Sequence, residues 1–203
     1  MKKKLWLFDF DGTVTTADTL LAFIRHACGT VHFLAGFALF SPLLVLMKLH
    51  LYPNYRAKQR LFAWFFKGMA EADFDARCRA FAADSVHLLR PEAVRFMRRC
   101  VESGGQVCIV SASIDNWVRP FFRDIGGGAQ PPLVVIGTQI EVKDGVLTGR
   151  FLTDNCYGAE KVRRVEVLFP DRNDYYITAF GDSRGDKELL DYADERHYRP
   201  FRR

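Results

Sequence analysis

Cysteine is scarce and unpaired in this sequence. The five cysteines are widely spaced and none belongs to a Cys-x-x-Cys pair, so the sequence predicts a reduced chain without a disulfide framework or a zinc knuckle. Neither sign of charge is in large excess: 29 Lys and Arg against 24 Asp and Glu give a net charge of +5. That excess permits acidic substrates, lipid surfaces or nucleic acid and selects none of them.

The composition also lacks the extremes of non-globular proteins. With 49% hydrophobic and 26% charged residues, wholesale disorder, collagen and a coiled coil are excluded. A length of 203 residues is enough for one compact domain, or for one core that carries a small insert. The N-terminus has no credible export signal, because Asp9 and Asp11 interrupt its apolar run after four residues. We therefore expect a cytoplasmic protein.

Three short apolar runs are each followed by a polar cluster, as expected of buried parallel strands. They cover residues 5–8, 106–110 and 175–180. Helices are predicted between them, one beginning at Pro91 and one over residues 158–168. This alternation is typical of an α/β fold with an open, mostly parallel sheet. Ligands bind such sheets at the carboxyl ends of the strands, so the three polar clusters are expected to converge there.

Two segments depart from this alternation. Residues 136–151 contain Lys143-Asp144-Gly145 between alternating runs, which predicts a small β-hairpin. Residues 16–88 carry no strand pattern and predict helices, that is, a helical cap inserted after the first strand. The expected organisation is a core of residues 1–15 and 89–203 with an all-helical cap over residues 16–88.

The first polar cluster, Asp9-Phe10-Asp11-Gly12-Thr13, places two carboxylates two residues apart just past a strand. There both side chains can face one pocket, which suits a nucleophilic carboxylate beside an acid/base carboxylate. Gly12 allows a tight turn, and the backbone N–H groups after Asp9 can hold phosphate oxygens. By itself the pattern also fits an ordinary loop or a calcium-binding fragment.

The other clusters carry candidate phosphate and metal ligands. Ser111, directly after the second strand, offers a hydroxyl and neighbouring N–H groups, including that of Ala112, to an oxyanion; alternatively it caps the helix that follows. Lys161 lies in the first turn of a helix, where a cation is unfavourable unless an anion is near; a solvated surface lysine is the alternative. Asp182 and Asp186 offer hard oxygen ligands for Mg²⁺, or belong to an acidic loop without a metal.

Found in this order, the four elements resemble the motifs of the haloacid dehalogenase superfamily. The first motif is Asp9 to Thr13, the second Ser111, the third Lys161, and the fourth Gly181-Asp182-Ser-Arg-Gly-Asp186. The match covers the whole chain. The resemblance implies a Rossmann-like core and, because the cap lies between the first and second motifs, the phosphoserine-phosphatase-like branch of the superfamily.

The resemblance also implies a role for each motif residue. Asp9 attacks phosphorus and becomes an aspartyl-phosphate, and Asp11 protonates the leaving alcohol and then activates water. Dehalogenases of this superfamily lack the second Asp, so Asp11 argues for phosphate-ester hydrolysis. The phosphoryl oxygens are implied to be bound by Gly12, Ser111, Ala112 and Lys161. The cofactor is implied to be Mg²⁺, held by Asp9, Asp11 through its backbone carbonyl, Asp182 and, as a ligand or an outer support, Asp186.

The substrate is less well indicated than the chemistry. Phosphoserine phosphatases carry a Glu nine residues after the nucleophile, a Gly-Gly after the second-motif serine and an Asn before the last Asp. This sequence has Asp18, Ala112-Ser113 and Gly185 at those positions. Each difference argues against phosphoserine itself and leaves the phosphatase chemistry unaffected. A small-metabolite phosphatase, phosphoserine phosphatase included, stays the alternative.

The cap contains 22 residues, His26 to Met47, without Lys, Arg, Asp or Glu. That length is enough to span a bilayer, but a single span would separate Asp9 from the other motifs, which must share one site. Gly36 and Pro42 instead predict two short helices that dip into one leaflet or pack on each other. The apolar core of a large cap is an equally open interpretation.

Basic residues flank this apolar stretch, as in proteins that work at an anionic lipid surface. They favour a phospholipid-type phosphomonoester as substrate and a peripheral contact of residues 26–47 with the inner face of the membrane, although a solvated helix face is the ordinary interpretation. The cap also loosely resembles that of bacterial phosphatidylglycerophosphate phosphatases. The flanking residues are Arg25, Lys48, Arg56, Lys58 and Arg60. The candidates for binding the non-reacting part of the substrate are Asp18, Arg25, Arg56 and Arg60.

Two further classes of protein are alternatives. One is a phosphate-binding relative that does not turn over a substrate. The presence of every charged motif residue argues against this class. The other is a nucleic-acid-binding protein. Its only sequence support is the basic termini, residues 2–4 and 202–203, which lack interleaved aromatic residues. We therefore expect no nucleic-acid partner.

Overall fold

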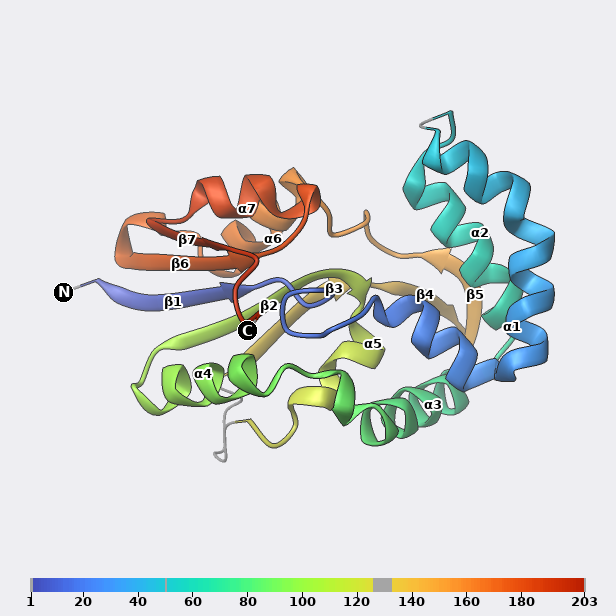
Figure 1. Ribbon diagram of the computed structural model, residues 1–203, viewed down its shortest axis with the longest axis horizontal. Coiled ribbons are helices and arrows are strands. Elements are labelled where there is room, and N and C mark those ends of the chain that lie inside the picture. Colours follow the sequence, from blue (N-terminus) through green and yellow to red (C-terminus); the bar gives the residue numbers. More distant parts are fainter. Residues whose placement is uncertain (1, 50, 126–132, 203) are drawn as a thin grey trace.

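The computed structural model describes residues 2–49, 51–125 and 133–202. At its centre lies a sheet of five parallel strands in the order β3-β2-β1-β6-β7 (Figure 1). This sheet confirms the predicted α/β class, and it is wider than predicted because the sequence patterns did not place β3 and β7 in it. The strands are β1 (Lys3–Phe8), β2 (Gln106–Ile114), β3 (Leu133–Thr138), β6 (Tyr175–Gly181) and β7 (Glu195–Tyr198).

Strand β1 is apolar on both faces because helices cover both sides of the sheet. Successive side chains of a strand point to opposite faces, so Leu7 packs in one cluster with Val165 and Leu189. Phe8 packs in the opposite cluster with Met97. The helices of the first layer are α6 (Ala159–Leu168) and α7 (Lys187–Tyr192), and those of the second are α4 (Pro91–Glu102) and α5 (Asp115–Val118) (Figure 1). Short 3₁₀ turns lie at Val86–Leu88, Arg119–Phe122, Arg172–Asp174 and Arg184–Asp186.

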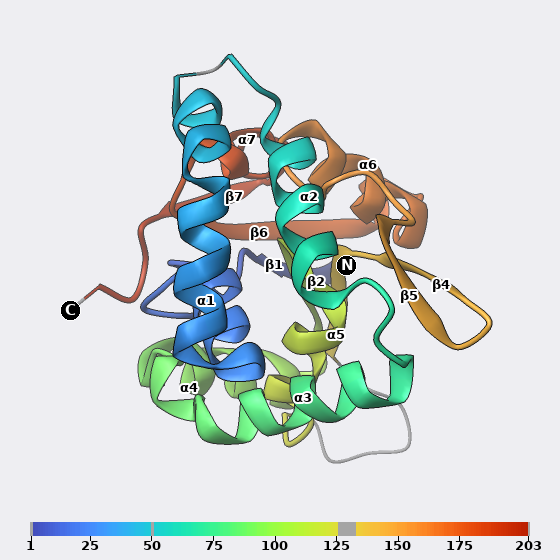
Figure 2. The same cartoon turned by 90° about the vertical axis from the view of Figure 1, so that its right-hand side faces the viewer.

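Three helices lie in residues 16–88, the cap segment, in agreement with its predicted helical content. Helices α1 and α2 stand side by side beyond the end of the sheet where β1, β2 and β6 finish (Figure 2). Gly36 permits this close packing, because a Cβ at that position would lie 2.4 Å from Cζ of Phe65. The third helix packs on α5 and the turn after it, with the rings of Phe81 and Phe121 5.6 Å apart. The three helices are α1 (Thr19–Lys48), α2 (Asn54–Phe66) and α3 (Glu71–Asp84).

The apolar helix α1 breaks at Gly29 and not at the residues expected to interrupt it. Gly29 has φ 79° and ψ 160°, a combination that glycine adopts without a steric penalty. Pro42 lies inside the helix, and the carbonyl of Ala38, which a proline nitrogen cannot bond, accepts from Ser41 Oγ instead (2.8 Å). The prediction of two short helices separated at Gly36 and Pro42 is therefore wrong.

The second strand is longer than predicted. It continues to Ile114, so Ser111, Ala112 and Ser113 belong to the strand and do not follow it. The register of β2 against β3 shifts between Val110 and Ile114, which marks a bulge at the carboxyl end of the strand. An apolar run indicates only the regular part of a strand, and a bulge that re-aims polar side chains lies beyond that signal.

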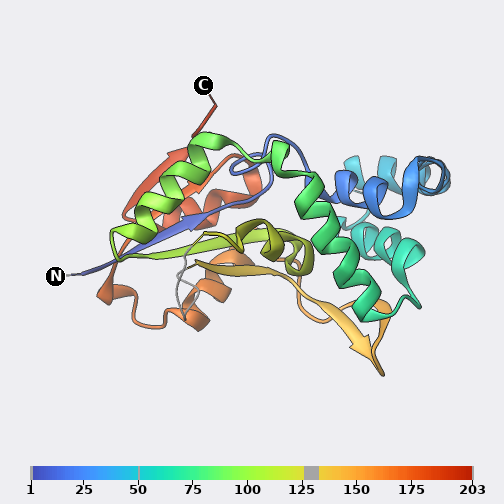
Figure 3. The same cartoon turned by 90° about the horizontal axis from the view of Figure 1, so that it is seen from below.

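A separate antiparallel hairpin joins β4 (Ile140–Lys143) to β5 (Val146–Phe151) at the predicted turn. Asp144 and Gly145 both have positive φ, 51° and 73°, as a type I′ turn requires. Residues 136–138, expected to begin this hairpin, belong to β3 instead. The hairpin lies against α2 and not in the central sheet (Figure 3).

The two linkers that join the cap segment to the sheet pair with each other. The backbone N–H of Thr16 donates to the carbonyl of Leu88, and that of Arg90 donates to the carbonyl of Val14, each over 2.8 Å. The chain therefore leaves and re-joins the sheet through one short antiparallel ribbon.

A second set of backbone hydrogen bonds ties the cap segment to the hairpin. The N–H of Gly68 donates to the carbonyl of Leu147 (2.9 Å), and that of Glu71 donates to the carbonyl of Gly145 (2.8 Å). Helices α1 to α3 and the hairpin are thus hydrogen-bonded into one unit beyond the end of the sheet.

Candidate active site

Asp9, Ser111 and Asp182 lie at the carboxyl ends of three adjacent strands, β1, β2 and β6. Residues at the ends of neighbouring parallel strands meet at one edge of the sheet. The backbone N–H of Asp9 donates to the carbonyl of Phe180 (2.9 Å), which continues the pairing of β1 with β6 as far as the carboxylate. The predicted convergence of the polar clusters at this edge is confirmed.

Lys161, in the first turn of α6, crosses from that helix into the same site. Its Nζ donates to Asp9 Oδ1 (2.6 Å), to Asp186 Oδ1 (2.6 Å) and to the carbonyl of Val110 (2.7 Å), and its side chain is 2% exposed. Burial alone would lower the pKa of Lys161, but the carboxylates of Asp9 and Asp186 outweigh it and hold that pKa above its ordinary value. Lys161 is a fixed buried cation, so the interpretation as a solvated surface lysine is wrong.

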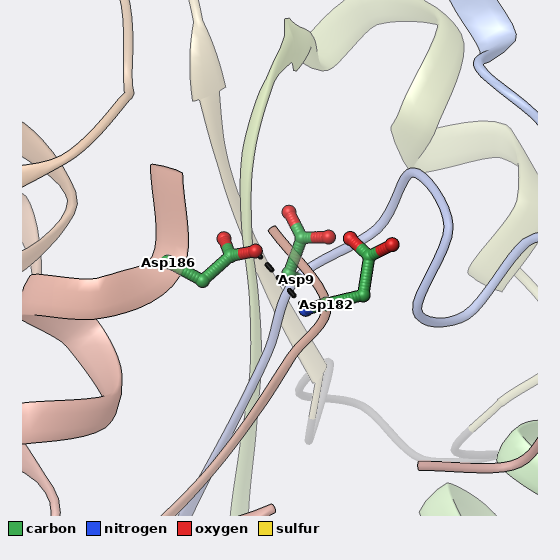
Figure 4. Close-up of side chains that lie close together, drawn as sticks. All are labelled: Asp9, Asp182 and Asp186. Carbon is green, nitrogen blue, oxygen red and sulfur yellow. Dashed lines mark hydrogen bonds between the residues drawn. The ribbon is translucent and has the colours of Figure 1, made fainter. Parts of the chain in front are cut away.

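Three carboxylates gather beside this lysine, those of Asp9, Asp182 and Asp186 (Figure 4). One oxygen from each lies within 4.8 Å of the others. Both oxygens of Asp186 are engaged: Oδ1 by Lys161, and Oδ2 by the N–H groups of Asp182 (3.1 Å) and Ser183 (3.0 Å) and the Ser183 hydroxyl (2.8 Å). Within the described part of the chain, no hydrogen bond reaches Asp9 Oδ2 or Asp182 Oδ1. Asp182 Oδ1 is therefore available to a cation, and Asp9 Oδ2 is available to a cation or to a reacting ligand.

The donor set fits Mg²⁺, which prefers oxygen ligands. Gly12 makes room for the carboxylate of Asp182. The φ of Gly12 is +81°, and a Cβ there would lie 2.5 Å from Asp182 Oδ2. Only glycine therefore allows the first motif to pass so close to the Asp182 carboxylate. The carboxylate of Asp11 lies outside this acidic cluster.

The pKa values of the three clustered carboxylates shift in different directions. Burial, and secondarily the charge of Asp186, raises the pKa of Asp9 to about 7, although Lys161 opposes the shift. Burial and the charge of Asp186 also raise the pKa of Asp182. Burial acts in the same direction on Asp186, but Lys161 and Ser183 outweigh it and lower the pKa of that residue. Asp186 therefore stays ionised beside Lys161, and a divalent cation would relieve the repulsion among the three carboxylates.

Asp11 is held at the boundary between the sheet and the cap segment. Its Oδ1 accepts from the backbone N–H and the hydroxyl of Thr19, both at 2.7 Å, and its Oδ2 accepts from the hydroxyl of Ser113 at 2.6 Å. Burial raises the pKa of Asp11, and the charge of Asp18 adds to the shift, while these hydrogen bonds oppose it. The sequence patterns did not identify Thr19 or Ser113 as site residues, because their role depends on contacts across the fold.

Ser111 is fully buried in the bulge of β2. Its Oγ accepts from the backbone N–H of Ser113 (3.0 Å), and no side chain caps α5, which begins after Ile114. The alternative that Ser111 caps the following helix is therefore wrong. Ala112 next to it lines the cavity described below, and its carbonyl accepts from the hydroxyl of Thr138 (3.0 Å).

A cavity of about 830 Å³ opens above these residues, between the edge of the sheet and helices α1 and α2. Its floor is polar and includes Asp9, Asp11, Gly12, Ala112, Lys161, Asp182 and Asp186. One wall is apolar and consists of Leu20, Leu21, Phe37, Leu44, Met47 and Leu61. Cationic side chains line the cavity besides Lys161, namely Lys48, Lys58, Arg90 and Arg202. The cavity thus joins a polar, charged floor to an apolar wall.

Only one of the four residues predicted to bind the non-reacting part of the substrate lines the cavity. Asp18 lines the cavity, and Arg25, Arg56 and Arg60 lie outside its lining. The guanidinium groups of Arg56 and Arg60 lie over the rings of Tyr55 and Tyr52. The lining cations that the prediction did not select are Lys48, Lys58, Arg90 and Arg202. The first two belong to the basic flank noted in the sequence, whereas Arg90 and Arg202 reach the cavity only through the folding of the chain.

Comparison with known proteins places the chain in a family. The model of the haloacid dehalogenase-like hydrolases matches residues 6–191. The chain belongs to this family. Protein CicA of Caulobacter vibrioides is 37% identical to it over 200 residues, which cover 96% of this chain and 85% of CicA.

Solved structures share the fold of this haloacid dehalogenase-like hydrolase. A protein of unknown function from Bordetella pertussis Tohama I superposes with a TM-score of 0.82 at 21% identity, covering 97% of this chain and 89% of its own. A phosphoserine phosphatase with substrate bound superposes with a TM-score of 0.62 at 18% identity, covering 98% and 86%. The predicted superfamily and its Rossmann-like core are confirmed. Haloacid dehalogenase-like hydrolases typically use Mg²⁺, and the acidic cluster that such a cofactor needs is present here.

Proposed function

We propose that this chain is a Mg²⁺-dependent phosphomonoesterase that works through an aspartyl-phosphate on Asp9. The observation that carries the proposal is the state of the Asp9 carboxylate. One of its oxygens is fixed by the buried Lys161 at 2.6 Å, and the other accepts no hydrogen bond from the described residues. A carboxylate oriented in this way at the floor of a cavity suits in-line attack on phosphorus.

The chemical step follows from this arrangement. Oδ2 of Asp9 bonds to phosphorus while the bond from phosphorus to the leaving oxygen breaks, and Asp11 gives its proton to that oxygen. Water then attacks phosphorus, Asp11 takes a proton from it, and the bond to Asp9 breaks to release phosphate. Burial raises the pKa of Asp11, which favours the protonated form that the first step needs.

Positive charge around the floor stabilises the charge on the phosphoryl oxygens. Lys161 contributes a permanent cation, and in this proposal groups of Gly12, Ser111 and Ala112 bind those oxygens. When bound, Mg²⁺ would neutralise part of the phosphoryl charge. Its ligands would be Asp9, Asp182 and the backbone carbonyl of Asp11, with Asp186 as an outer support.

The apolar wall favours a phosphomonoester with a substantial apolar part, such as a phospholipid-type phosphomonoester. A small charged metabolite would leave Leu21, Phe37 and Leu44 facing water, whereas an acyl or alkyl chain would bury them. Lys48 and Lys58 line the cavity beside this wall and supply charge for a second anionic group of the substrate. Such a substrate would bring the enzyme to the inner face of the cytoplasmic membrane.

The test is release of inorganic phosphate in the presence and absence of Mg²⁺. A lipid phosphomonoester in mixed micelles is compared with a panel of small phosphomonoesters that includes phosphoserine. Asp9→Asn should abolish release, and the matched change Asp171→Asn, at an exposed aspartate outside the cavity, should leave it intact. Equal release by Asp9→Asn and the unaltered protein would refute the mechanism. A preference for a small ester would refute only the substrate class.

A further inference from the structure

The outer face of α1 is an exposed apolar surface. It consists of Val31, Leu34, Leu39, Val45 and Leu46, together with Leu49 directly after the helix, and these side chains are between 41% and 81% exposed. These residues recur at helical spacing and so lie along one side of the helix. Only 6% of the most apolar 18-residue window of α1 is buried. An apolar helix in a protein core is normally buried on most of its surface. An exposed apolar surface of this kind is typical of a site that binds a protein or a membrane.

The charge of the surrounding segment has one sign. Residues 19–70 contain no Asp or Glu, although the whole chain has 24. The same residues contain six Lys and Arg, more than the net charge of +5 for the entire chain. These six are Arg25, Lys48, Arg56, Lys58, Arg60 and Lys67. A partner that is both apolar and negatively charged therefore complements this segment.

The opposite face of the same helix belongs to the candidate active site. Phe37, Leu44 and Met47 line the cavity, and none of them belongs to the outer α1 face. Lys48, at the end of the helix, lines the cavity and is exposed to solvent. Helix α1 thus contributes both to the lining of the cavity and to the uncovered apolar surface.

We propose that the outer α1 face docks on an anionic lipid bilayer, with α1 lying in the plane of the interface. An apolar stripe buried among acyl chains and basic residues at the level of the lipid phosphates is how interfacial helices bind membranes. Helix α1 does not span the bilayer, because its inner face packs on α2 and the chains before and after the cap segment return to one site. A second copy of this protein is a poorer partner, because it would bring a second segment with basic residues and no acidic ones against the first.

The experiment is sedimentation of the purified full chain with lipid vesicles. The probes are vesicles of phosphatidylcholine alone and vesicles of phosphatidylcholine mixed with phosphatidylglycerol. The variant is Leu34→Gln with Val45→Gln, which removes two exposed apolar side chains from the outer α1 face. The matched control is Val167→Gln with Leu168→Gln on α6, whose side chains are 69% and 51% exposed. Thermal unfolding checks that both double variants fold.

We expect the unaltered protein and the α6 control to sediment with the mixed vesicles and to bind less with added salt. The α1 variant should bind at least about tenfold more weakly, because two buried apolar side chains are lost. Equal binding of the two double variants, or no binding by the unaltered protein, would overturn the proposal. So would a dimer in solution that the α1 variant dissociates, which would assign this face to a second copy.

A second readout separates this proposal from the proposed function. Hydrolysis of a water-soluble phosphomonoester should be the same in both double variants, because neither pair lines the cavity. Loss of vesicle binding with unchanged hydrolysis supports docking by the outer α1 face. Absence of hydrolysis in every form, with vesicle binding intact, would refute the phosphatase mechanism and leave the docking surface standing.

Discussion

Asp11 accepts two hydrogen bonds on the same oxygen from Thr19, one from the backbone N–H and one from the hydroxyl, both 2.7 Å long. Thr19 is the first residue of α1 and is fully buried. Its hydroxyl oxygen also accepts from Nε1 of Trp117 (3.2 Å). The carboxylate proposed as acid and base is therefore oriented by the helix that forms the apolar wall of the cavity.

Replacement of Thr19 by Val should lower kcat about tenfold with little change in KM, because one of the hydrogen bonds that orient Asp11 is lost and the substrate contacts stay. Steady-state kinetics on a soluble phosphomonoester measure this. Thr19→Ser keeps the hydroxyl and should restore most of the rate. If Thr19→Ser were as slow as Thr19→Val, packing of the threonine methyl group, and not the hydrogen bond to Asp11, would explain the loss.

Replacement of Gly12 by Ala should abolish Mg²⁺ binding and activity. The new Cβ would lie 2.5 Å from Asp182 Oδ2 at a φ of +81°, so either the turn or the carboxylate has to move, at a cost of about 1–3 kcal/mol. Isothermal titration with Mg²⁺ and phosphate release measure the effect. The control is Gly145→Ala in the hairpin turn, where φ is +73° and a Cβ meets open space. That variant should lose about 1 kcal/mol of stability and keep its activity.

The raised pKa of Asp9 predicts how Mg²⁺ binding depends on pH. Its value of about 7 lies above the ordinary 3.8, so between these values the folded metal-free protein holds a proton that the unfolded chain has released. The stability of the metal-free protein should therefore fall as pH rises through this window. Mg²⁺ competes with the same proton, so it should raise Tm more at about pH 8 than at about pH 6. Thermal unfolding with Mg²⁺ or with a chelator tests this, and an equal shift at both pH values would contradict it.

Removal of the Arg202 side chain should strengthen Mg²⁺ binding. Nη2 of Arg202 lies 2.6 Å from Asp182 Oδ2, with its side chain 38% exposed, and so places a competing cation on a proposed ligand. Because the pair is partly solvated, the gain from Arg202→Ala should be modest, about two- to fivefold in Kd. Arg196→Ala is the control, since Arg196 bonds to Asp191, which is outside the cavity lining. Weaker Mg²⁺ binding by Arg202→Ala would show instead that Arg202 holds Asp182 in place.

The sequence was sufficient for the parts of the site that follow strand ends. Asp9, Lys161 and Asp182 could be placed together because an apolar run, a turn and a helix start each leave a local pattern, and parallel strands share one edge. The motif order then specified the family, which the match over residues 6–191 confirms. The three middle strands of the central sheet, β2, β1 and β6, were predicted for the same reason.

Features that depend on contacts across the fold could not be predicted. Ser113 reaches Asp11 because β2 bulges near its end, and no local pattern marks a bulge. Gly36 was taken as a helix breaker, but it remains helical because α2 packs against it, and the break occurs at Gly29 where no neighbour would contact a Cβ. Arg202 reaches the cavity from the end of the chain. In each case tertiary packing decides between conformations that the local sequence permits.

The hydrogen bonds of the β4–β5 hairpin to the link between α2 and α3 limit how the cavity can open. Together these helices and the hairpin cross to the sheet four times along the chain: near residues 15 and 89, after β3, and after β5. A body joined at two adjacent points can swing about the line between them, whereas one joined at four points cannot do so without bending the other two connections. Rotation about the ribbon formed by Thr15 and Leu89 would also separate α3 from α5. Substrate exchange should therefore depend on side chains at the mouth of the cavity and on small shifts of α1. The apolar wall and the catalytic floor should keep nearly the same position relative to each other.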